Sequence, residues 1–152
     1  RNCIADFARE DLLLVVEFLT YRLPDEDPAA YKEKFPSLIE GGTRLCLEAG
    51  AKVLKLPYPG TADSCATITK LCGDVPWSVL SAGVDHETFL GQVEIAMDRG
   101  AAGVIAGRAL WKDCVFLDRD RQREALRNIA VPRLKQIQAI LDRHPRTLKR
   151  VA

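Results

Sequence analysis

The sequence predicts an α/β fold built on a parallel sheet, and two observations lead to this prediction. Four short apolar runs recur along the 152 residues, and each is bounded by glycine, proline or aspartate. Stretches with helical periodicity separate these runs, so strands and helices alternate. Because alternation requires right-handed crossovers, and because continuous apolar strands suit a sheet covered on both faces, we expect a parallel sheet with helices between its strands.

The four apolar runs are the expected strands, at residues 11–21, 51–58, 75–83 and 101–110. Each run is too short for a core helix. Their spacing is about that of the TIM (β/α)8 barrel, which needs eight strands and typically ~250 residues. We therefore expect one domain that holds about the last four βα units of a barrel. The alternative is a small open doubly wound sheet, although no GxGxxG element follows the first run.

Helices are expected in the first part of the chain at three places. Residues 2–10 have the pattern of the end of a helix. Pro28 follows a capping aspartate and predicts a helix start. Pro36 predicts the start of a second helix, which ends at Gly50 because glycine commonly follows the last helical residue.

Three further helices are expected after the second strand. Residues 62–73 form one of them, and residues 85–100 form the clearest, with Asp85 as its N-cap. The amphipathic stretch 119–144 contains a proline, so a break or kink is expected near Val131.

The composition is that of an ordinary globular protein, 47% hydrophobic and 28% charged with a net charge of +1. This balance gives no reason to expect nucleic acid or a membrane surface as a partner. No apolar run approaches the ~20 residues that span a bilayer, and no signal-peptide pattern is present, so a cytoplasmic location is expected. Since the first residue is Arg1, the natural N-terminus is expected elsewhere, and a natural product, a fragment and a split subunit all remain open.

The cysteines and histidines predict no metal site and no cofactor. The five cysteines include no close CxxC pair, so reduced thiols are expected, with Cys65 and Cys72 on one helical face. His86 and His144 are the only histidines, which is too few for a His-rich site.

Polar residues stand where three predicted strands end. Catalytic groups of barrel enzymes lie at the carboxyl ends of strands, and here these ends carry Glu17, Lys55 and Ser81. Because side chains alternate along a strand, Val79 and Ser81 are expected to share a face, and all three polar residues to point into one barrel mouth. Lys52 has the opposite parity to Lys55 and is expected on the surface.

A lysine within an apolar strand has a specific chemical use. An amine must be neutral to attack a carbonyl and form a Schiff base, and apolar surroundings favour the neutral amine. The resulting iminium accepts electrons and allows an adjacent carbon–carbon bond to break, while a carboxylic acid such as Glu17 shuttles protons. A snorkelling or surface lysine is the alternative interpretation of Lys55.

The residues after the last two strands predict an anion site, because small residues with free N–H groups are followed there by an arginine. These residues are Ser81, Ala82, Gly83, Gly107 and Arg108. Helix N-termini and guanidinium groups bind phosphate, and barrels often place a phosphate at their last two loops. The alternative is that both glycines only serve tight turns.

The segment "VPWSVLSAGVDHETFLGQVEIAMDRGAAGVIAGRALWKD" closely resembles the C-terminal part of the class I aldolase family that includes tagatose-1,6-bisphosphate aldolase and sulfofructose-phosphate aldolase. "VVEFLTY" resembles the family's strand with the acid/base glutamate, and "AKVLKLPYP" its strand with the Schiff-base lysine. The resemblance spans almost the whole chain. It implies metal-independent cleavage of a phosphorylated ketose to dihydroxyacetone phosphate and an aldehyde.

The resemblance also implies roles for individual residues. Lys55 forms the imine, Glu17 shuttles protons, and Ser81, Gly83, Gly107 and Arg108 bind the substrate's phosphate. The sequence departs from the family at Pro57, where relatives tend to have glutamate, and at Phe18, where they often have proline.

The family's first half is absent, so we expect the isolated chain to be weakly active or inactive. The expected partners are a sugar phosphate and either further copies of the chain or a missing N-terminal half-barrel. The alternative function is an inert half-barrel that binds phosphate and self-associates through its sheet edges. Another phosphate-binding barrel, such as an isomerase or a deoxyribose-phosphate-type aldolase, is a weaker option. The particular ketose phosphate remains open.

Overall fold

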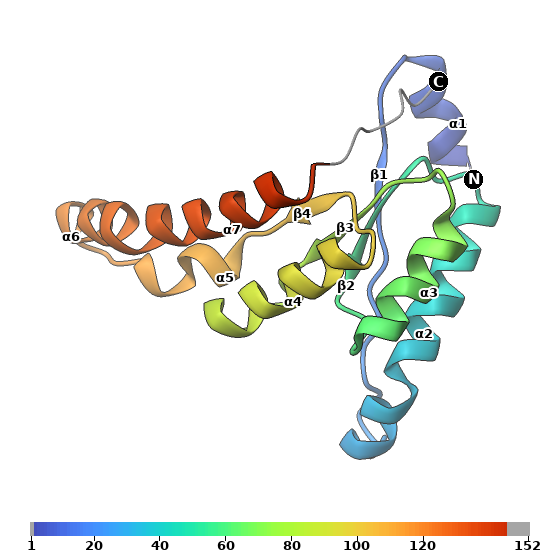
Figure 1. Cartoon of the computed structure of the whole chain (residues 1–152), viewed down its shortest axis with the longest axis horizontal. Helices are drawn as coiled ribbons and strands as arrows, with labels where there is room; N and C mark the ends of the chain where they lie inside the picture. The colour runs from blue at the N-terminus through green and yellow to red at the C-terminus, as the bar shows by residue number, and fades with distance from the viewer. Residues whose placement is uncertain (1, 146–152) are drawn as a thin grey trace.

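Four parallel strands form one sheet in the computed structural model, which describes residues 2–145 (Figure 1). The strands pair in chain order and are β1 Val15–Glu17, β2 Val53–Pro57, β3 Trp77–Leu80 and β4 Gly103–Ile105. The predicted parallel α/β fold is confirmed. Each strand is shorter than the apolar run that predicted it, because the flanking residues of each run belong to loops or to helix starts.

The helices begin and end mostly where capping residues predict. They are α1 Asn2–Arg9, α2 Pro28–Glu48, α3 Ala62–Cys72, α4 His86–Asp98, α5 Arg108–Trp111, the 3-10 turn η1 Lys112–Cys114, α6 Arg119–Ala125, the π-helical turn η2 Leu126–Ala130 and α7 Val131–Arg143. Asp85 caps α4 as predicted, since its carboxylate accepts the Thr88 N–H at 2.9 Å. None of these helices is long and apolar enough to cross a membrane.

The helix predicted to begin at Pro36 is wrong, and the break or kink predicted near Val131 takes the form of a π turn. Pro36 lies inside α2, a single helix of 21 residues, and begins no new helix. A proline removes one backbone donor from the helix, but the buried residues Ile39 and Thr43 keep the turns of α2 that follow the proline packed against the core. Near Val131 the chain stays helical, and the Val131 N–H donates to the Leu126 carbonyl across a wide π turn instead of breaking.

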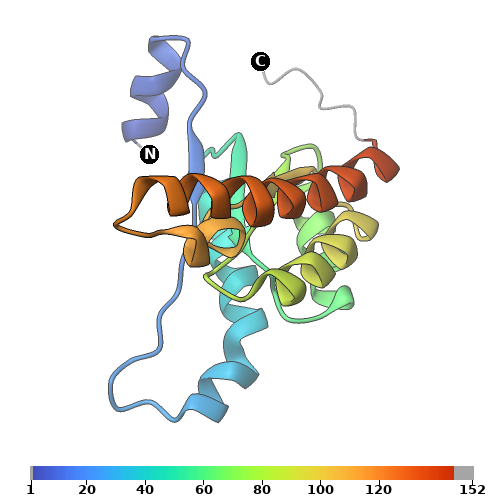
Figure 2. The ribbon, with the colours of Figure 1, turned by 90° about the vertical axis from the view of Figure 1, so that its left-hand side faces the viewer.

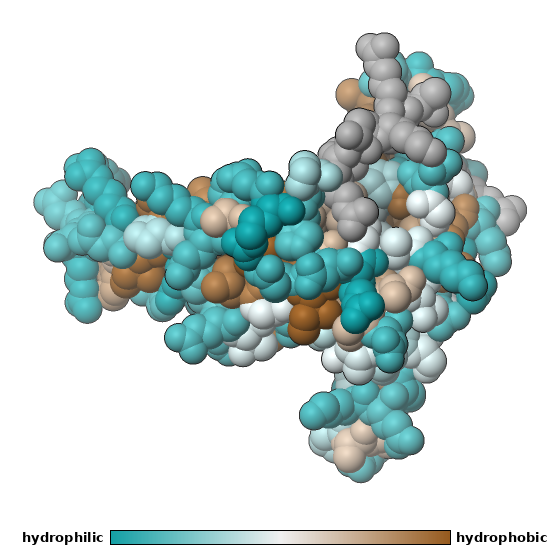
Figure 3. Space-filling view, in the orientation of Figure 1, coloured by the Kyte–Doolittle hydropathy of each residue, from teal (hydrophilic) through white to brown (hydrophobic). Residues whose placement is uncertain are grey.

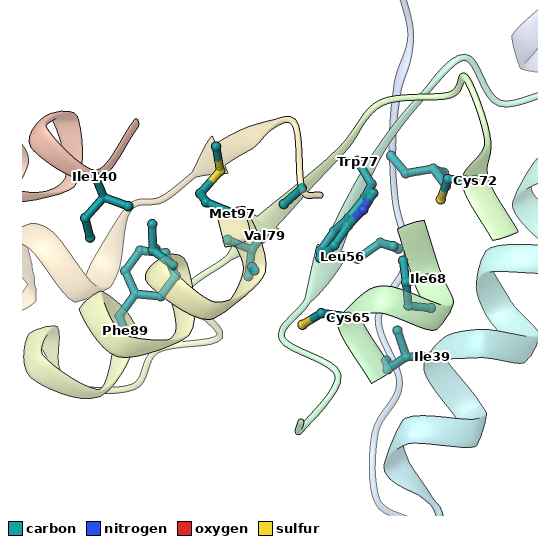
Figure 4. Close-up of a cluster of buried hydrophobic side chains, with 14 of the residues drawn as sticks. Ile39, Leu56, Cys65, Ile68, Cys72, Trp77, Val79, Phe89, Met97 and Ile140 are labelled. Carbon is teal, nitrogen blue, oxygen red and sulfur yellow. The ribbon is translucent and has the colours of Figure 1, made fainter. Parts of the chain in front are cut away.

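The core lies between the sheet and a row of helices in which α2, α3, α4 and α7 each pack against the next (Figure 2). The strand residues that point into this core are at most 1% exposed, namely Leu54, Leu56, Trp77 and Val79. Figure 4 shows Leu56, Trp77 and Val79 in one cluster with Phe89, Met97 and Ile68.

The opposite face of the sheet has a different character. Val15 and Ile105 lie on it and are 41% and 38% exposed. The expectation of a sheet covered on both faces is therefore wrong, since helices pack on one face as they do in one half of a barrel.

The cysteines within the core are unreactive. All five cysteines are free, and α3 turns Cys65 and Cys72 towards the core together, as predicted. Burial raises the pKa of both thiols to about 11, so both stay protonated near neutral pH.

An ion pair fastens α7 to the short helical turns that follow β4. The Arg133 guanidinium donates to both carboxylate oxygens of Asp113, at 2.6 and 2.7 Å, and to the Leu110 carbonyl at 3.1 Å. The hydrogen bonds from Arg133 lower the pKa of Asp113 to about 2. Because Leu110 belongs to α5, this contact also fixes the helix that carries Arg108.

Replacing Asp113 by asparagine is expected to remove an acid-sensitive part of the stability. Because folding lowers the pKa of Asp113, its carboxylate stabilises the folded protein at pH values above its ordinary pKa of 3.8. This contribution to the free energy of unfolding disappears as the pH falls towards about 2. The free-energy advantage of the wild type over Asp113→Asn should therefore shrink between about pH 4 and about pH 2. Urea unfolding at both pH values measures it, and an advantage that does not change with pH would contradict the assignment.

Candidate active site

A pocket of about 230 Å³ opens at the carboxyl ends of the strands. All four strands or the residues just after them contribute to its lining, which comprises Glu17, Lys55, Leu80, Ser81, Ala82, Ile105, Ala106, Gly107, Arg108 and Trp111. The structure thus brings together six of the seven residues predicted for the site. Gly83, the seventh, does not line the pocket and lies behind Arg108.

Lys55 and Glu17 form an ion pair at the base of this site. Their strands are neighbours, and the register sets the two residues directly opposite each other. The Lys55 Nζ donates to Glu17 Oε2 at 2.9 Å, with side chains 24% and 39% exposed. The ammonium therefore has a partner, and a proton can pass between the two groups over one hydrogen bond. Among the described residues, Glu17 is the only carboxylate that lines the pocket.

The register corrects the expected face of β3. Lys55 lies opposite Ser78, whereas Val79 lies opposite Leu56 and points into the core. The prediction that Val79 shares the face of Lys55 is therefore wrong, because a shift of one residue in register exchanges the two faces of a strand. Ser81 still lines the pocket because β3 ends at Leu80 and the chain then turns.

The turn after β3 has an unusual backbone. Ala82 and Gly83 both have positive φ angles, of 48° and 82°, and the Val84 N–H donates to the Ser81 carbonyl at 3.1 Å. Within residues 2–145, the N–H groups of Ala82 and Gly83 take part in no backbone hydrogen bond. Both are therefore free to bind an oxyanion, and of the two residues Ala82 lines the pocket.

Arg108 lies across this turn and begins α5. Its guanidinium carbon is 3.5 Å from the position that a Cβ on Gly83 would occupy, so the arginine covers the glycine. Since α5 has only four residues, its dipole adds little, and the attraction for an anion rests on the Arg108 charge and the turn's N–H groups.

Four lining residues lie outside the seven predicted for the site, namely Leu80 and Ile105 on strands, Ala106 just before Gly107, and Trp111. The two aliphatic residues sit on strands as ordinary core residues would, so no signal separates them from the rest. The sequence position of Trp111 could have indicated that it lines the pocket, because Trp111 lies three residues after Arg108 and on the same helical face.

The two departures noted in the sequence have different structural consequences. Phe18 follows Glu17, and its ring fills the space that any side chain at Gly42 of α2 would need. The Phe18 N–H also donates to the Lys55 carbonyl at 3.2 Å, so Phe18 anchors the end of β1. Pro57 is buried at the end of β2 and brings no charge near Lys55.

Comparisons with known proteins identify a family and several aldolase relatives. The sequence model of the DeoC/LacD family of aldolases matches residues 2–113. A class 1 fructose-bisphosphate aldolase of Halobacterium salinarum is 34% identical over 92 residues, which cover 57% of this chain and 34% of the relative. A tagatose 1,6-diphosphate aldolase of Staphylococcus epidermidis is 28% identical over 168 residues, which cover 92% of this chain and 50% of the relative.

Solved structures agree with the sequence relatives. An archaeal fructose 1,6-bisphosphate aldolase superposes with a TM-score of 0.63 at 26% identity, over 89% of this chain and 48% of that one. A Schiff-base-forming fructose-1,6-bisphosphate aldolase gives the same TM-score at 27% identity, over 92% of this chain and 48% of that one. The chain therefore spans about a third to a half of the length of the proteins it matches, and its fold is that of a partial TIM barrel.

Proposed function

The chain belongs to the DeoC/LacD family of aldolases, and on this basis we propose that it carries the lysine-bearing half of a class I aldolase that cleaves a phosphorylated ketose to dihydroxyacetone phosphate and an aldehyde. The observation that supports the proposal is the contact of 2.9 Å between Lys55 Nζ and Glu17 Oε2 in a pocket that Arg108 also lines. The names of the relatives favour a ketose bisphosphate as the substrate.

Lys55 and Glu17 have complementary parts in the proposed reaction. Glu17 takes a proton from the Lys55 ammonium, and the neutral amine attacks the ketose carbonyl. The nitrogen passes one of its protons to the carbonyl oxygen and Glu17 returns the other, so the oxygen leaves as water and an iminium remains. Glu17, again a carboxylate, takes the proton of the hydroxyl on the second carbon from the iminium carbon. The bond between the first and second carbons breaks, the aldehyde is released, and the electron pair forms an enamine on Lys55. Protonation of the enamine and hydrolysis return dihydroxyacetone phosphate and the amine.

The substrate's phosphate is proposed to bind between Arg108 and the turn at Ala82 and Gly83. A guanidinium and two free N–H groups suit a dianionic phosphate. Binding there orients the ketose so that its carbonyl faces Lys55 across the pocket. No step in this scheme uses a metal ion or a cofactor. The free thiols of the core are consistent with a reducing compartment, and we place the activity in the cytoplasm.

Borohydride trapping tests the imine directly. The chain is incubated with dihydroxyacetone phosphate, reduced, digested and mapped by mass spectrometry. We expect a covalent adduct on Lys55 and none on Lys52, which lies exposed just before β2 and is the matched control. The proposed chemistry is refuted if Lys55 carries no adduct in the chain alone and also none after the chain is supplied with the first half of a related barrel.

A second candidate function is an inert half-barrel that binds phosphate and closes with a second copy of itself. The observation that favours it is the pair of unpaired sheet edges, β1 and β4, among the described strands. Beside the β4 edge, a groove of about 160 Å³ is lined by Val104, Ala106, Leu110, Leu134, Ile137, Gln138 and Leu141. Figure 3 shows the visible side of α7 as mostly hydrophilic, with apolar patches below it in the region of α5 and α4. Two copies related by a twofold axis would pair each β4 with the partner's β1.

Sedimentation velocity separates the two candidates. The second candidate predicts a concentration-dependent dimer, together with phosphate binding and no trapped adduct on Lys55. A strictly monomeric chain over micromolar to millimolar concentrations contradicts closure by a second copy. An adduct on Lys55 contradicts inertness, whatever the oligomeric state.

A further inference from the structure

Lys112 contacts the turn of the anion site from outside the pocket. Its Nζ donates to the Gly83 carbonyl at 2.9 Å and to the Val84 carbonyl at 3.3 Å. Lys112 follows α5 directly and does not line the pocket itself. It stands four residues after Arg108, so both cations reach the same turn from one helical face.

The turn has two features that call for such a contact. Ala82 adopts a positive φ of 48°, which a residue with a Cβ rarely takes without support from its surroundings. Within the turn, one backbone hydrogen bond, from the Val84 N–H to the Ser81 carbonyl, opposes unwinding. The carbonyls of Gly83 and Val84 would also repel an anion if they rotated towards the pocket, because their oxygens carry partial negative charge.

We propose that Lys112 is the positioning residue of the anion site, and that it fixes the Ser81–Val84 turn in the conformation that presents N–H groups to the substrate's phosphate. By binding the two carbonyl oxygens, its ammonium keeps them away from the pocket. The N–H groups of Ala82 and Gly83 then remain free for the anion. The inference rests on the proposed function, since the anion in question is the phosphate of the substrate.

Phosphate titration of the isotope-labelled chain tests this role. Inorganic phosphate is added while the amide signals of Ala82 and Gly83 are followed by NMR, which yields a Kd for the wild type and for each variant. Lys112→Met is expected to weaken binding about tenfold, the effect of losing a charge-assisted hydrogen bond that orders a loop. Lys112→Arg, which keeps the charge and the donors, should restore most of the affinity. Lys52→Met is the matched control and should bind as the wild type does.

A second variant separates positioning from simple charge. Glycine adopts positive φ without strain, so Ala82→Gly in the Lys112→Met background should recover part of the lost affinity. If Ala82→Gly recovers nothing, or if Lys112→Met binds phosphate as tightly as the wild type, the positioning role is refuted. If the wild type binds no phosphate, the anion site and the role of Lys112 both fail. The imine proposal is judged separately, by the adduct on Lys55.

Discussion

Replacing Lys55 by arginine is expected to abolish the borohydride-stable adduct completely. Arginine keeps a positive charge beside Glu17, so an ion pair with Glu17 can still form in place of the Lys55–Glu17 contact of 2.9 Å. A guanidinium stays protonated in proteins and cannot attack a carbonyl, so no imine forms. The variant therefore removes the nucleophile and retains the electrostatic partner of Glu17.

The companion variant Glu17→Gln should retain the nucleophile Lys55 and remove the group that accepts its proton. Glutamine can still accept a hydrogen bond from Lys55 but cannot take its proton. Slow adduct formation on Lys55 is expected, with the rate of the proton-transfer steps reduced by roughly 10²–10⁴. The time course of adduct formation, followed by mass spectrometry, measures this effect. If Lys55→Arg still formed the adduct, or if Glu17→Gln formed it at the wild-type rate, the assigned roles would be wrong.

Replacing Trp77 by alanine is expected to produce the largest loss of stability. Trp77 is 1% exposed on β3, and its Nε1 donates to Thr69 Oγ1 of α3 at 2.9 Å. The Thr69 hydroxyl in turn donates to the Arg99 carbonyl at 2.7 Å, which links α3 to the end of α4. Loss of the ring leaves a cavity and breaks this chain of bonds, which costs about 3–5 kcal/mol of the free energy of unfolding.

Two further variants test this explanation. One separates the contribution of the Trp77 ring from that of its hydrogen bond, and the other is a control at Trp111. Trp77→Phe keeps most of the apolar ring and loses the hydrogen bond, so a cost of about 1 kcal/mol is expected. Trp111→Ala removes the other tryptophan of the chain, which is 42% exposed, and should change the free energy of unfolding by less than about 0.5 kcal/mol. Urea unfolding monitored by circular dichroism measures all three. Equal losses at Trp77 and Trp111 would contradict the packing described for β3.

The fold was predictable from the sequence because its signals are local and repeated. Apolar runs alternating with capped helices such as the one after Asp85 leave few topologies other than a parallel sheet. The errors arose where tertiary packing outweighs a local rule. Pro36 breaks a helix in isolation, but α2 continues through it because its next turn is buried against the core.

The sequence was sufficient to predict most of the residues at the strand ends that form the candidate site, but not every detail of how they face one another. Glu17 and Lys55 stood out as charged residues in apolar runs, and their contact follows from the pairing of β1 with β2. The register of β3 was not predictable, since no feature of "WSVL" tells which of its two faces meets Lys55. Lys112 escaped notice for another reason. It acts through backbone carbonyls, and a lysine that binds carbonyls has no sequence pattern of its own.

The edge position of β1 has a consequence for the proposed catalysis. This strand carries Glu17, has three residues and pairs with one neighbour, while Phe18 supplies its main anchor on α2. We therefore expect β1 to open locally at a lower free-energy cost than global unfolding, and each opening would separate Glu17 from Lys55. In the proposed reaction, the fraction of molecules in which Glu17 meets Lys55 would then depend on the docking of one edge strand. A further strand paired with β1 would raise that fraction, and with it the turnover number of the proposed reaction, without touching the substrate.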